Sequence, residues 1–408
     1  MRRYVALILI FTILLFSLTG CYDVRPIETL SYAVAIGLDK GTNNLLRLSL
    51  QFASPGNSSS DGGSSSQFSE TTVTTVECSS LDSGINLINS YISNQINLAH
   101  AKVIVISEAL ASEGIADYIS TFVNNVEVRP DCNIIVSRCS AEDYLNHSKP
   151  TLETLSARYY EQVLNSSTYT GYTADITLSE FYSALKSPIA QPIAILGGIN
   201  TDSTHTNNSS TPYVEVDGSY DAGTTPIQNK TNLENMGLAV FDYDKLVGEL
   251  DGFECICHLM CVDEFESTTI TIPSPFNQNS IVDLYVYRKS AIQKDVKIVN
   301  GTPYISCNIH LNANVLSIGP DTDLSSVENM DIIAEYASSY LEEKFTEYLY
   351  RTSKEFHCDI DSFGTELYSD YLTISDFEKI DWLNIYKDAY FDVDVDISIR
   401  SSYLIIND

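Results

Sequence analysis

The sequence predicts a mixed α+β fold in which β-sheets are flanked by helices. Short apolar runs alternate with segments of helical periodicity in the first half of the chain, as in α/β domains. Residues Ile281–Ile318 alternate like several strands joined by turns such as Asn300-Gly301. In Phe391–Arg400 apolar and polar residues alternate strictly, which sends the apolar side chains to one face of a strand.

The first predicted elements are a β-hairpin and a helix. Residues Tyr32–Asp39 form an apolar run with a turn signal at Gly37–Gly41, and Leu45–Phe52 alternates as a second strand would. Residues 54–66, rich in Ser, Gly, Asn and Asp, are expected to form a flexible loop. The helix is indicated by apolar residues that recur every three or four places, namely Leu81, Ile85, Ile88, Ile92 and Ile96.

Strands and helices continue to alternate up to about residue 196. Ser140 is expected to cap a short helix that runs through Leu145. The predicted strands are Lys102–Ile106, Asn133–Val136 and Ile193–Leu196, and the predicted helices are Glu108–Val123, Thr151–Leu164 and Leu178–Leu185.

The second half of the chain is predicted to be rich in strands. A polar stretch up to about Asn232 is expected to be a long loop, and Gly237–Val247 a β-hairpin. Ser325–Phe356 is the longest helical candidate. The residues available to face its core are Ile332, Ile333, Tyr336, Tyr340, Leu341 and Phe345.

At 408 residues the chain is long enough for two or three domains with hydrophobic cores of their own. We expect a lipoprotein signal peptide at residues 1–20 and an N-terminal α/β domain at 21–190. A middle domain with the long polar loop is expected at 191–275, and a C-terminal α+β domain at 276–408.

The amino terminus has the sequence pattern of a bacterial lipoprotein signal peptide. Arg2 and Arg3 precede an uncharged apolar run, Tyr4–Leu18, and Leu18-Thr19-Gly20-Cys21 is similar to the bacterial lipobox. In such sites the thiol receives a diacylglyceryl group and a peptidase cuts before the cysteine, so Cys21 is the predicted lipidation site. Two acyl chains hold a protein durably at a bilayer. The alternative, an uncleaved membrane anchor, needs roughly 20 apolar residues, more than this run provides.

The net charge of the chain limits the classes of molecule that it can bind. The formal net charge is −31, and it becomes −33 without residues 1–20, which contain two arginines. This acidity disfavours nucleic acid and repels an anionic membrane surface, so attachment is expected through the lipid and a protein partner. No second apolar stretch approaches spanning length, so the mature chain is expected to be a water-soluble body held by one anchor. The fifteen or so residues between Cys21 and Ile36 span at most about 50 Å, so the first domain should lie beside the membrane.

Eight cysteines follow Cys21. Export permits disulfides, but eight cysteines allow about a hundred pairings and the sequence selects none. The segment Cys255-x-Cys257-His258-x-x-Cys261 has the ligand types that zinc prefers. Its spacing is poor for zinc, no second cysteine pair is near, and on a strand the first two thiols would share a face. We therefore expect packed thiols or a disulfide, and no metal.

Two further groups of side chains contain residue types that can take part in chemistry. One is the row of aspartates on the last predicted strand, Asp392, Asp394 and Asp396. Calcium needs about six oxygens brought together by a sharp turn, so a solvated face is expected instead. The other is a Ser-His-acid set, His100, Ser107 and Glu108. There is no Gly-x-Ser-x-Gly elbow and no glycine-rich phosphate loop, so we expect no catalytic, cofactor-binding or metal site.

Several segments, taken in order, resemble the germinant-receptor C-subunit lipoproteins of spore-forming Firmicutes, the family called Ger(x)C. The segments that carry the resemblance are Cys21, Ala35–Lys40, His100–Ile106, Ala111–Ile115, Val128–Pro130, Gly237–Phe241, Leu246–Leu250, Asp361–Gly364, Asp381-Trp382 and the terminal strand through Arg400. The chain departs from the family pattern at Tyr22, where Trp is usual, at Glu249, where an aromatic is common, and at Tyr403, which is often Gly.

The resemblance implies a non-catalytic lipoprotein of three mixed α/β domains at the outer face of the spore inner membrane. It implies two membrane-spanning partners, the A and B receptor subunits, in complexes that sense nutrients and trigger ion and dipicolinate release. Two alternatives are a lipid-anchored solute-binding protein of a transporter and an envelope-assembly or structural lipoprotein. A solute-binding protein would have two similar lobes around a deep cleft.

Overall fold

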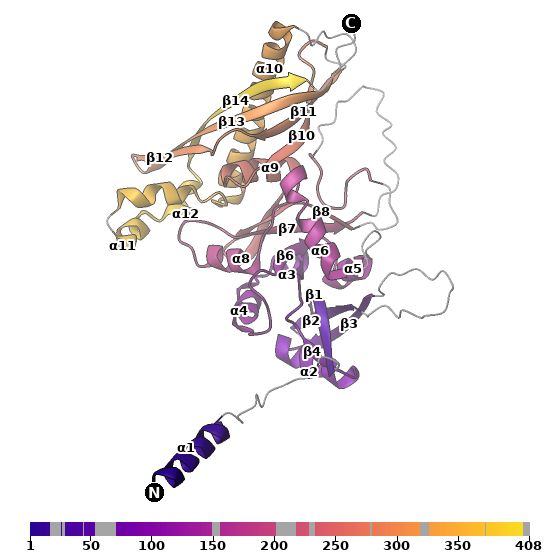
Figure 1. The fold of residues 1–408 in the computed structure, drawn as a ribbon. Helices are drawn as coiled ribbons and strands as arrows, with labels where there is room; N and C mark the ends of the chain where they lie inside the picture. The colour runs from indigo at the N-terminus through magenta and orange to yellow at the C-terminus, as the bar shows by residue number, and fades with distance from the viewer. Residues whose placement is uncertain are drawn as a thin grey trace.

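The computed structural model describes residues 1–16, 26, 29–43, 45–53, 71–148, 156–200, 218–227, 233–277, 280–318, 326–371 and 373–402. Two β-sheets, each with helices packed on it, follow one another along the chain (Figure 1). This arrangement confirms the mixed α+β class. The lipobox with Cys21, residues 54–66 and most of the polar stretch before Asn232 lie outside the described residues.

The first sheet has nine strands, and those at its centre run parallel. Its strands are β1 (Leu30–Lys40), β2 (Leu46–Ala53), β3 (Thr71–Cys78), β4 (Gln95–Asn97), β5 (Val103–Ser107), β6 (Asn133–Ser137), β7 (Ile193–Ile199), β8 (Leu233–Asp242) and β9 (Lys245–Leu250). The order is β3-β2-β1-β5-β6-β7-β8-β9, with β4 beside the start of β1. β1, β5, β6 and β7 are parallel, whereas β1–β2 and β8–β9 form the two predicted hairpins.

Helices cover both faces of this sheet, as a parallel sheet requires. The helices are α2 (Leu81–Tyr91), α3 (Glu108–Ala111), α4 (Ala116–Asn124), α5 (Ala141–His147), α6 (Ser156–Leu164), α7 (Ser167–Thr170), α8 (Leu178–Leu185) and α9 (Gly252–Cys261). Successive strand residues point to opposite faces. Accordingly Ile104 and Ile106 of β5 belong to a core with α2, α4 and α8, whereas Val103 and Val105 belong to a core with α5, α6 and α9.

Two expectations for this region are wrong. The single helix expected at Glu108–Val123 is divided into α3 and α4. Gly114 between them has a φ of +120°, which L side chains rarely adopt, and a Cβ there would lie 2.8 Å from an oxygen of Asp244. Ile96, expected on the face of the first helix, lies on β4, because α2 ends at Tyr91 and the Ile96 amide donates to Asn89 Oδ1 at 2.8 Å.

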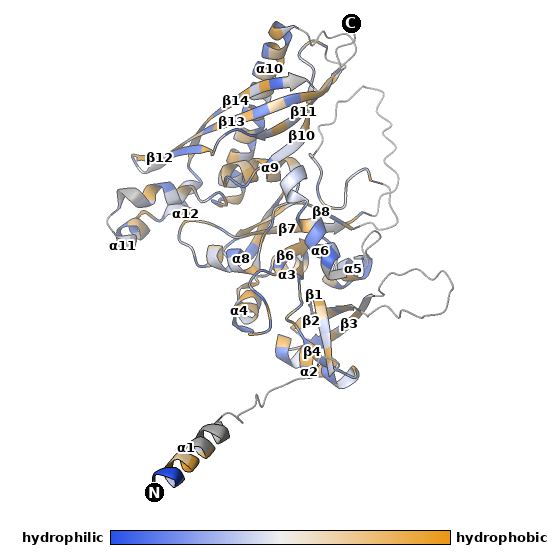
Figure 2. Ribbon diagram, viewed as in Figure 1, coloured by the Kyte–Doolittle hydropathy of each residue, from blue (hydrophilic) through white to orange (hydrophobic). Residues whose placement is uncertain are grey.

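The second sheet contains β10 (Ser267–Pro273), β11 (Ile281–Arg288), β12 (Gln293–Val299), β13 (Thr302–Ile318) and β14 (Tyr390–Ser402). The order is β10-β11-β13-β12, and β14 pairs in parallel with β13. Asn300 and Gly301 form the predicted turn, with φ values of 54° and 84° as in a type I′ hairpin. The predicted alternation of β14 is confirmed, with Val395 and Ile397 buried, and is visible in Figure 2.

The long helix α10 (Val327–Tyr350) packs along β14 and continues into a π-helical segment, η2 (Arg351–Phe356). Leu341 and Phe345 are buried as expected. Ile332 and Tyr336, also expected in the core, are 38% and 37% exposed, because the buried side of the helix follows Ile333 instead. The remaining segments are η3 (Phe363–Asp370), α11 (Ile374–Phe377), η4 (Glu378–Ile380) and α12 (Trp382–Tyr386).

Side chains of α10 cover part of the outer edge of β14. The backbone amide of Val395 donates to Glu342 Oε1 at 3.2 Å, and that of Ile397 donates to Ser338 Oγ at 3.1 Å. These amides point away from β13 and so have no partner strand. The helix therefore satisfies donors that a sheet edge would otherwise present to solvent.

The amino-terminal helix α1 (Arg2–Phe16) stands apart from the body in Figure 1. Among the described residues, no helix is both long enough and apolar enough to cross a membrane. The expected domains at 21–190, 191–275 and 276–408 stay a prediction. The strands β7, β8 and β9 continue the sheet that β1 begins.

Candidate functional site

The residues of the Ser-His-acid set lie at opposite ends of one strand. His100 precedes β5 and Ser107 ends it, so at about 3.3 Å per residue they are on the order of 20 Å apart. The His100 ring packs edge-on against Tyr32, with ring centroids 4.4 Å apart. The structure therefore does not bring His100 to Ser107 or to its neighbour Glu108.

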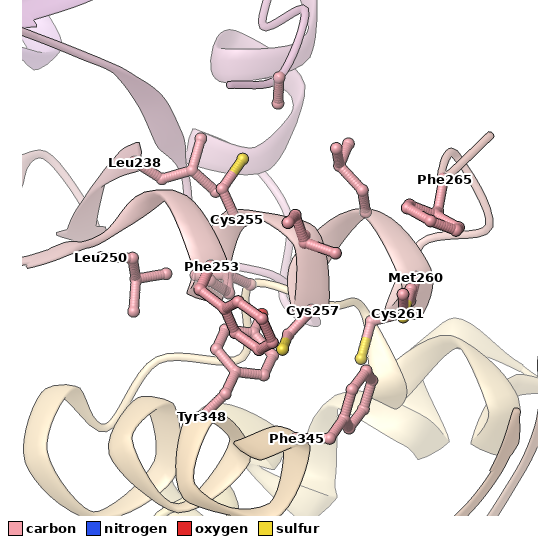
Figure 3. Close-up of a cluster of buried hydrophobic side chains, with 14 of the residues drawn as sticks. Leu238, Leu250, Phe253, Cys255, Cys257, Met260, Cys261, Phe265, Phe345 and Tyr348 are labelled. Carbon is pink, nitrogen blue, oxygen red and sulfur yellow. The ribbon is translucent and has the colours of Figure 1, made fainter. Parts of the chain in front are cut away.

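The cysteine cluster lies on a helix, so the expectation that Cys255 and Cys257 share a strand face is wrong. Residues two apart on a helix point in different directions, and in Figure 3 Cys255 points toward Leu238 whereas Cys257 points toward Tyr348. Cys255, Cys257 and Cys261 are buried and free. Burial raises the pKa of each thiol, so all three are protonated at neutral pH.

A capping box explains why this segment is helical. Asp251 accepts a hydrogen bond from the Glu254 amide at 2.8 Å, and the Glu254 carboxylate accepts one from the Asp251 amide at 2.9 Å. The sequence Asp251-Gly252-Phe253-Glu254 was the signal that could have identified α9. In the part of the chain that the structure describes, no group of three His, Cys, Asp or Glu side chains is placed to hold a metal ion.

The aspartates of the terminal strand lie on its exposed side. Asp392, Asp394 and Asp396 are exposed, and Asp396 pairs with Lys289 at 3.2 Å and lies 3.4 Å from His310 Nδ1. A straight strand keeps their carboxylates apart, unlike the turn of a calcium loop. Cys21, the predicted lipidation site, falls outside the described residues.

The structure places a crevice at the carboxyl ends of β5 and β6. The chain leaves β5 into α3, whose Leu110 belongs to the core on one face, and leaves β6 into α5, whose Tyr144 belongs to the core on the other. In α/β sheets, connections that diverge in this way open a crevice where ligands commonly bind. This crevice has a volume of about 470 Å³, and its lining includes Asp39, Arg47, Ser107, Glu108, Arg138 and Cys139.

Most charged groups of the crevice are engaged within the protein. Asp39 accepts hydrogen bonds from the first two amides of α5, at 2.7 and 3.1 Å, and so joins the end of β1 to that helix. Arg138 donates to Glu249 at 2.9 Å and to Asp221 at 3.1 Å. Arg47 pairs with Glu142. These side chains act as structural connections between β1, β2, β9, α5 and the residue that follows β6.

The crevice contains two groups that could in principle react. The Ser107 side chain is buried, and its hydroxyl has no hydrogen-bond partner within the described residues. Cys139 is partly buried, its sulfur lies 3.1 Å from Ser137 Oγ, and burial raises the pKa of its thiol. Among the described residues neither group is hydrogen-bonded to a histidine or a carboxylate. The arrangement offers polar contacts without an activated nucleophile.

A buried polar cluster joins the two sheets, and no prediction from the sequence included it. Asp359 accepts hydrogen bonds from the amides of Asp361, Phe363 and Gly364, at 3.1 to 3.2 Å, and from Trp382 Nε1 at 2.7 Å. Burial, reinforced by the neighbouring Asp361, raises the pKa of Asp359 to about 7. The cluster unites the segment Asp361–Gly364 with Trp382, two of the motifs noted in the sequence.

Asp361 extends this cluster toward the first sheet. Its Oδ1 accepts a hydrogen bond from Tyr348 at 2.7 Å and lies 2.9 Å from Nδ1 of His258 on α9. The Gln191 amide, just before β7, donates to the Asp359 carbonyl at 2.8 Å. The cluster thus connects α9 and the start of β7 to the C-terminal sheet.

Comparisons with known proteins find similarity to spore germination proteins along most of the chain. Residues 23–197 match the family described as spore germination protein N-terminal domain, and residues 236–403 match the one described as spore germination B3/GerAC like, C-terminal. In Bacillus subtilis (strain 168), spore germination protein YfkR is 23% identical over 65% of this chain, and spore germination protein KC is 22% identical over 87%. The matched regions cover 63% of YfkR and 84% of KC. A crystal structure of the GerBC protein aligns with 92% of this chain and 99% of its own, with a TM-score of 0.49 and 14% identity.

Proposed function

Since this chain belongs to the Ger(x)C family of spore germinant-receptor C subunits, we propose that it acts in spore germination as a lipid-anchored, non-catalytic receptor subunit that docks onto membrane-spanning A and B subunits. The proposal rests on how much of the chain the two family matches cover. They cover residues 23–197 and 236–403 and so include most of the chain beyond Cys21. The similarity to spore germination protein KC covers 87% of this chain.

The proposed location is the outer face of the spore inner membrane, with Cys21 as the lipidated anchor. The lipobox at Leu18–Cys21 and the two arginines before the apolar run support it. β1 begins at Leu30, nine residues after Cys21, so the tether spans at most about 30 Å. The first sheet would then lie close to the membrane-spanning subunits.

The positions and contacts of the side chains that were candidates for chemistry support a binding role without catalysis. His100 and Ser107 are far apart, the cysteines of α9 are buried thiols, and the charged groups of the crevice hold secondary structure together. The structure also disfavours a solute-binding protein. Its two described sheets differ in strand number and order and do not form two similar lobes.

Deletion of the gene in its sporulating host tests the proposal. Spores of the mutant should fail to germinate with the nutrient that the receptor senses and should still germinate with calcium dipicolinate, which bypasses nutrient receptors. Normal nutrient germination, combined with defective uptake of a solute, would instead support the transporter alternative. A defect in both germination routes would point to a structural envelope protein.

Crosslinking tests the docking part of the proposal. Because the tether is short, crosslinks from this chain to the A and B subunits should concentrate within residues 22–190. Crosslinks confined to residues 275–408 would contradict it. Replacing the exposed His100 with alanine should leave germination kinetics unchanged at equal protein level. Slower germination of this variant would instead indicate a catalytic role for His100.

A further inference from the structure

The amino ends of the parallel strands lie together at one end of the first sheet. β4, which begins at Gln95, pairs with the start of β1. The turn that contains Val126 lies beside it, because the Leu98 amide donates to Glu127 Oε2 at 3.1 Å. Tyr91, the last residue of α2, is four residues before β4 and so within about 14 Å of it. We call the surface formed by α2, β4 and Val126 the amino-edge surface.

This surface carries less charge than the rest of the chain. Its charged side chains are Asp82, in the first turn of α2, and Glu127, whose carboxylate accepts the Leu98 amide beside Val126. Charged residues make up 19% of the sequence, and the formal net charge is −31. The stretch from Ser83 to Ala101, which includes most of α2 and all of β4, contains no Asp, Glu, Lys or Arg. A strongly acidic surface would be repelled by anionic lipid headgroups, whereas a surface with few charges can approach them. The amino-edge surface is therefore suited to lie against a membrane that the remainder of the protein would avoid.

The exposed side chains of the amino-edge surface are large and apolar. Leu87 is 51% exposed, Tyr91 is 81% exposed and Val126 is fully exposed. Leu87 and Tyr91 are four residues apart on α2 and so lie on one side of the helix, while Leu81 and Ile88 face the core. Single exposed apolar residues are ordinary, but three at one edge of an acidic protein form an apolar contact surface. Tyrosine and leucine are side chains that membrane interfaces favour.

The tether ends at the same place. Leu30 pairs with Gln95 of β4, and Cys21 lies nine residues before Leu30. From the tether, the low charge and the exposed side chains, we propose that the amino-edge surface rests in the headgroup layer of the bilayer, with Leu87 and Tyr91 inserted between lipids. This inference depends on the proposed lipidation of Cys21, and it adds a second contact that would fix the orientation of the subunit.

Quenching by spin-labelled lipids tests the inference on the full-length acylated protein. The protein is reconstituted into phosphatidylcholine vesicles that contain phosphatidylglycerol and nitroxide-labelled lipid. A fluorophore is attached through Tyr91→Cys in a Cys139→Ser background, because Cys139 is the partly exposed one among the described cysteines. The matched control is Tyr304→Cys on the second sheet, where the tyrosine is 46% exposed. We expect quenching at position 91 to be at least twofold stronger than at position 304.

A second variant tests the contact without moving the probe. With the fluorophore on Val126→Cys, the added substitution Leu87→Asp should reduce lipid quenching, because a carboxylate is repelled by the phosphatidylglycerol headgroups. An exposed Leu87→Asp change leaves the core intact, so thermal unfolding should stay unchanged. Quenching that does not respond to Leu87→Asp would contradict a role for Leu87 in the contact.

The outcomes separate the inference from the proposed function. Equal, weak quenching at positions 91 and 304 in a protein whose Cys21 carries fatty acid would refute the inference and leave the anchor intact. Loss of the fatty-acid label from Cys21 would refute the anchor and, with it, the tether argument. If co-reconstituted A and B subunits shield position 91 from both the lipid nitroxide and aqueous iodide, the occupant is protein, and the lipid contact is wrong.

Discussion

Replacing Asp359 by Asn should remove a pH dependence of stability that the buried carboxyl creates. The usual pKa of an aspartate is 3.8, and burial next to Asp361 raises that of Asp359 to about 7 in the folded protein. Between these values the folded state binds one more proton than the unfolded chain. The free energy of unfolding therefore falls as the pH rises through this window and levels off above about pH 7. A pKa difference of about three corresponds to roughly 4 kcal/mol.

The measurement compares wild type with Asp359→Asn in denaturant titrations at pH 4, 5, 6, 7 and 8. The variant cannot titrate at this position, so the wild type should lose up to roughly 4 kcal/mol of stability relative to the variant between pH 4 and 7. The comparison cancels the contributions of the other carboxylates. Asp392→Asn, at an exposed position, controls for the loss of one acidic group. A difference that stays constant over this range would show that Asp359 is ionised in the folded protein and would refute the reasoning.

Three further predictions concern the anchor, the cysteines and the crevice. Cys21→Ala should abolish fatty-acid labelling and membrane-held accumulation, and persistent labelling of the variant would disprove the lipidation site. Elemental analysis of the purified protein should find no stoichiometric metal, and a metal that is lost when Cys255 and Cys257 are replaced would contradict this. Asp39→Ala leaves the first two amides of α5 without their acceptor, so it should lower the free energy of unfolding by about 2 kcal/mol in denaturant titrations. An unchanged midpoint would show that Asp39 does not hold α5.

Elements whose signal is local could be predicted from the sequence. α8 has the predicted bounds, Leu178–Leu185, because Thr177 and Glu180 form a capping box at its start. Ser140 caps α5 as expected, with its hydroxyl 3.0 Å from the Asp143 amide. The strict alternation of Phe391–Arg400 identified β14, since a period of two fits only a strand. In each case a few neighbouring residues determine the structure.

Features that depend on distant residues could not be predicted in this way. The break between α3 and α4 follows from the approach of Asp244 to Gly114, which are far apart in sequence. The exposure of Ile332 and Tyr336 depends on how α10 lies on the sheet, and the helical period alone leaves that rotation open. The separation of His100 and Ser107, by contrast, could be predicted, because the expected strand Lys102–Ile106 lies between them.

The polar cluster around Asp359 shows why site prediction was incomplete. Its members come from α9, α10, η3, α12 and the segment before η3, and only His258 belongs to a segment that was considered for chemistry. The resemblance noted Asp361–Gly364 and Trp382 as separate segments. Their contact through Asp359 is a property of the tertiary structure. The lipidation of Cys21 and the division into domains stay predictions from the sequence.

The contact between α10 and the outer edge of β14 has a consequence for crowding. Lipid anchors confine proteins to two dimensions and raise their local concentration, so neighbouring copies meet often. An open strand edge in such a layer invites one copy to add a strand to the next. The Val395 and Ile397 amides already donate to Glu342 and Ser338, so a neighbouring strand cannot pair with this part of the edge. If the chain is lipid-anchored as proposed, this cover would hinder neighbouring copies from polymerising through β14.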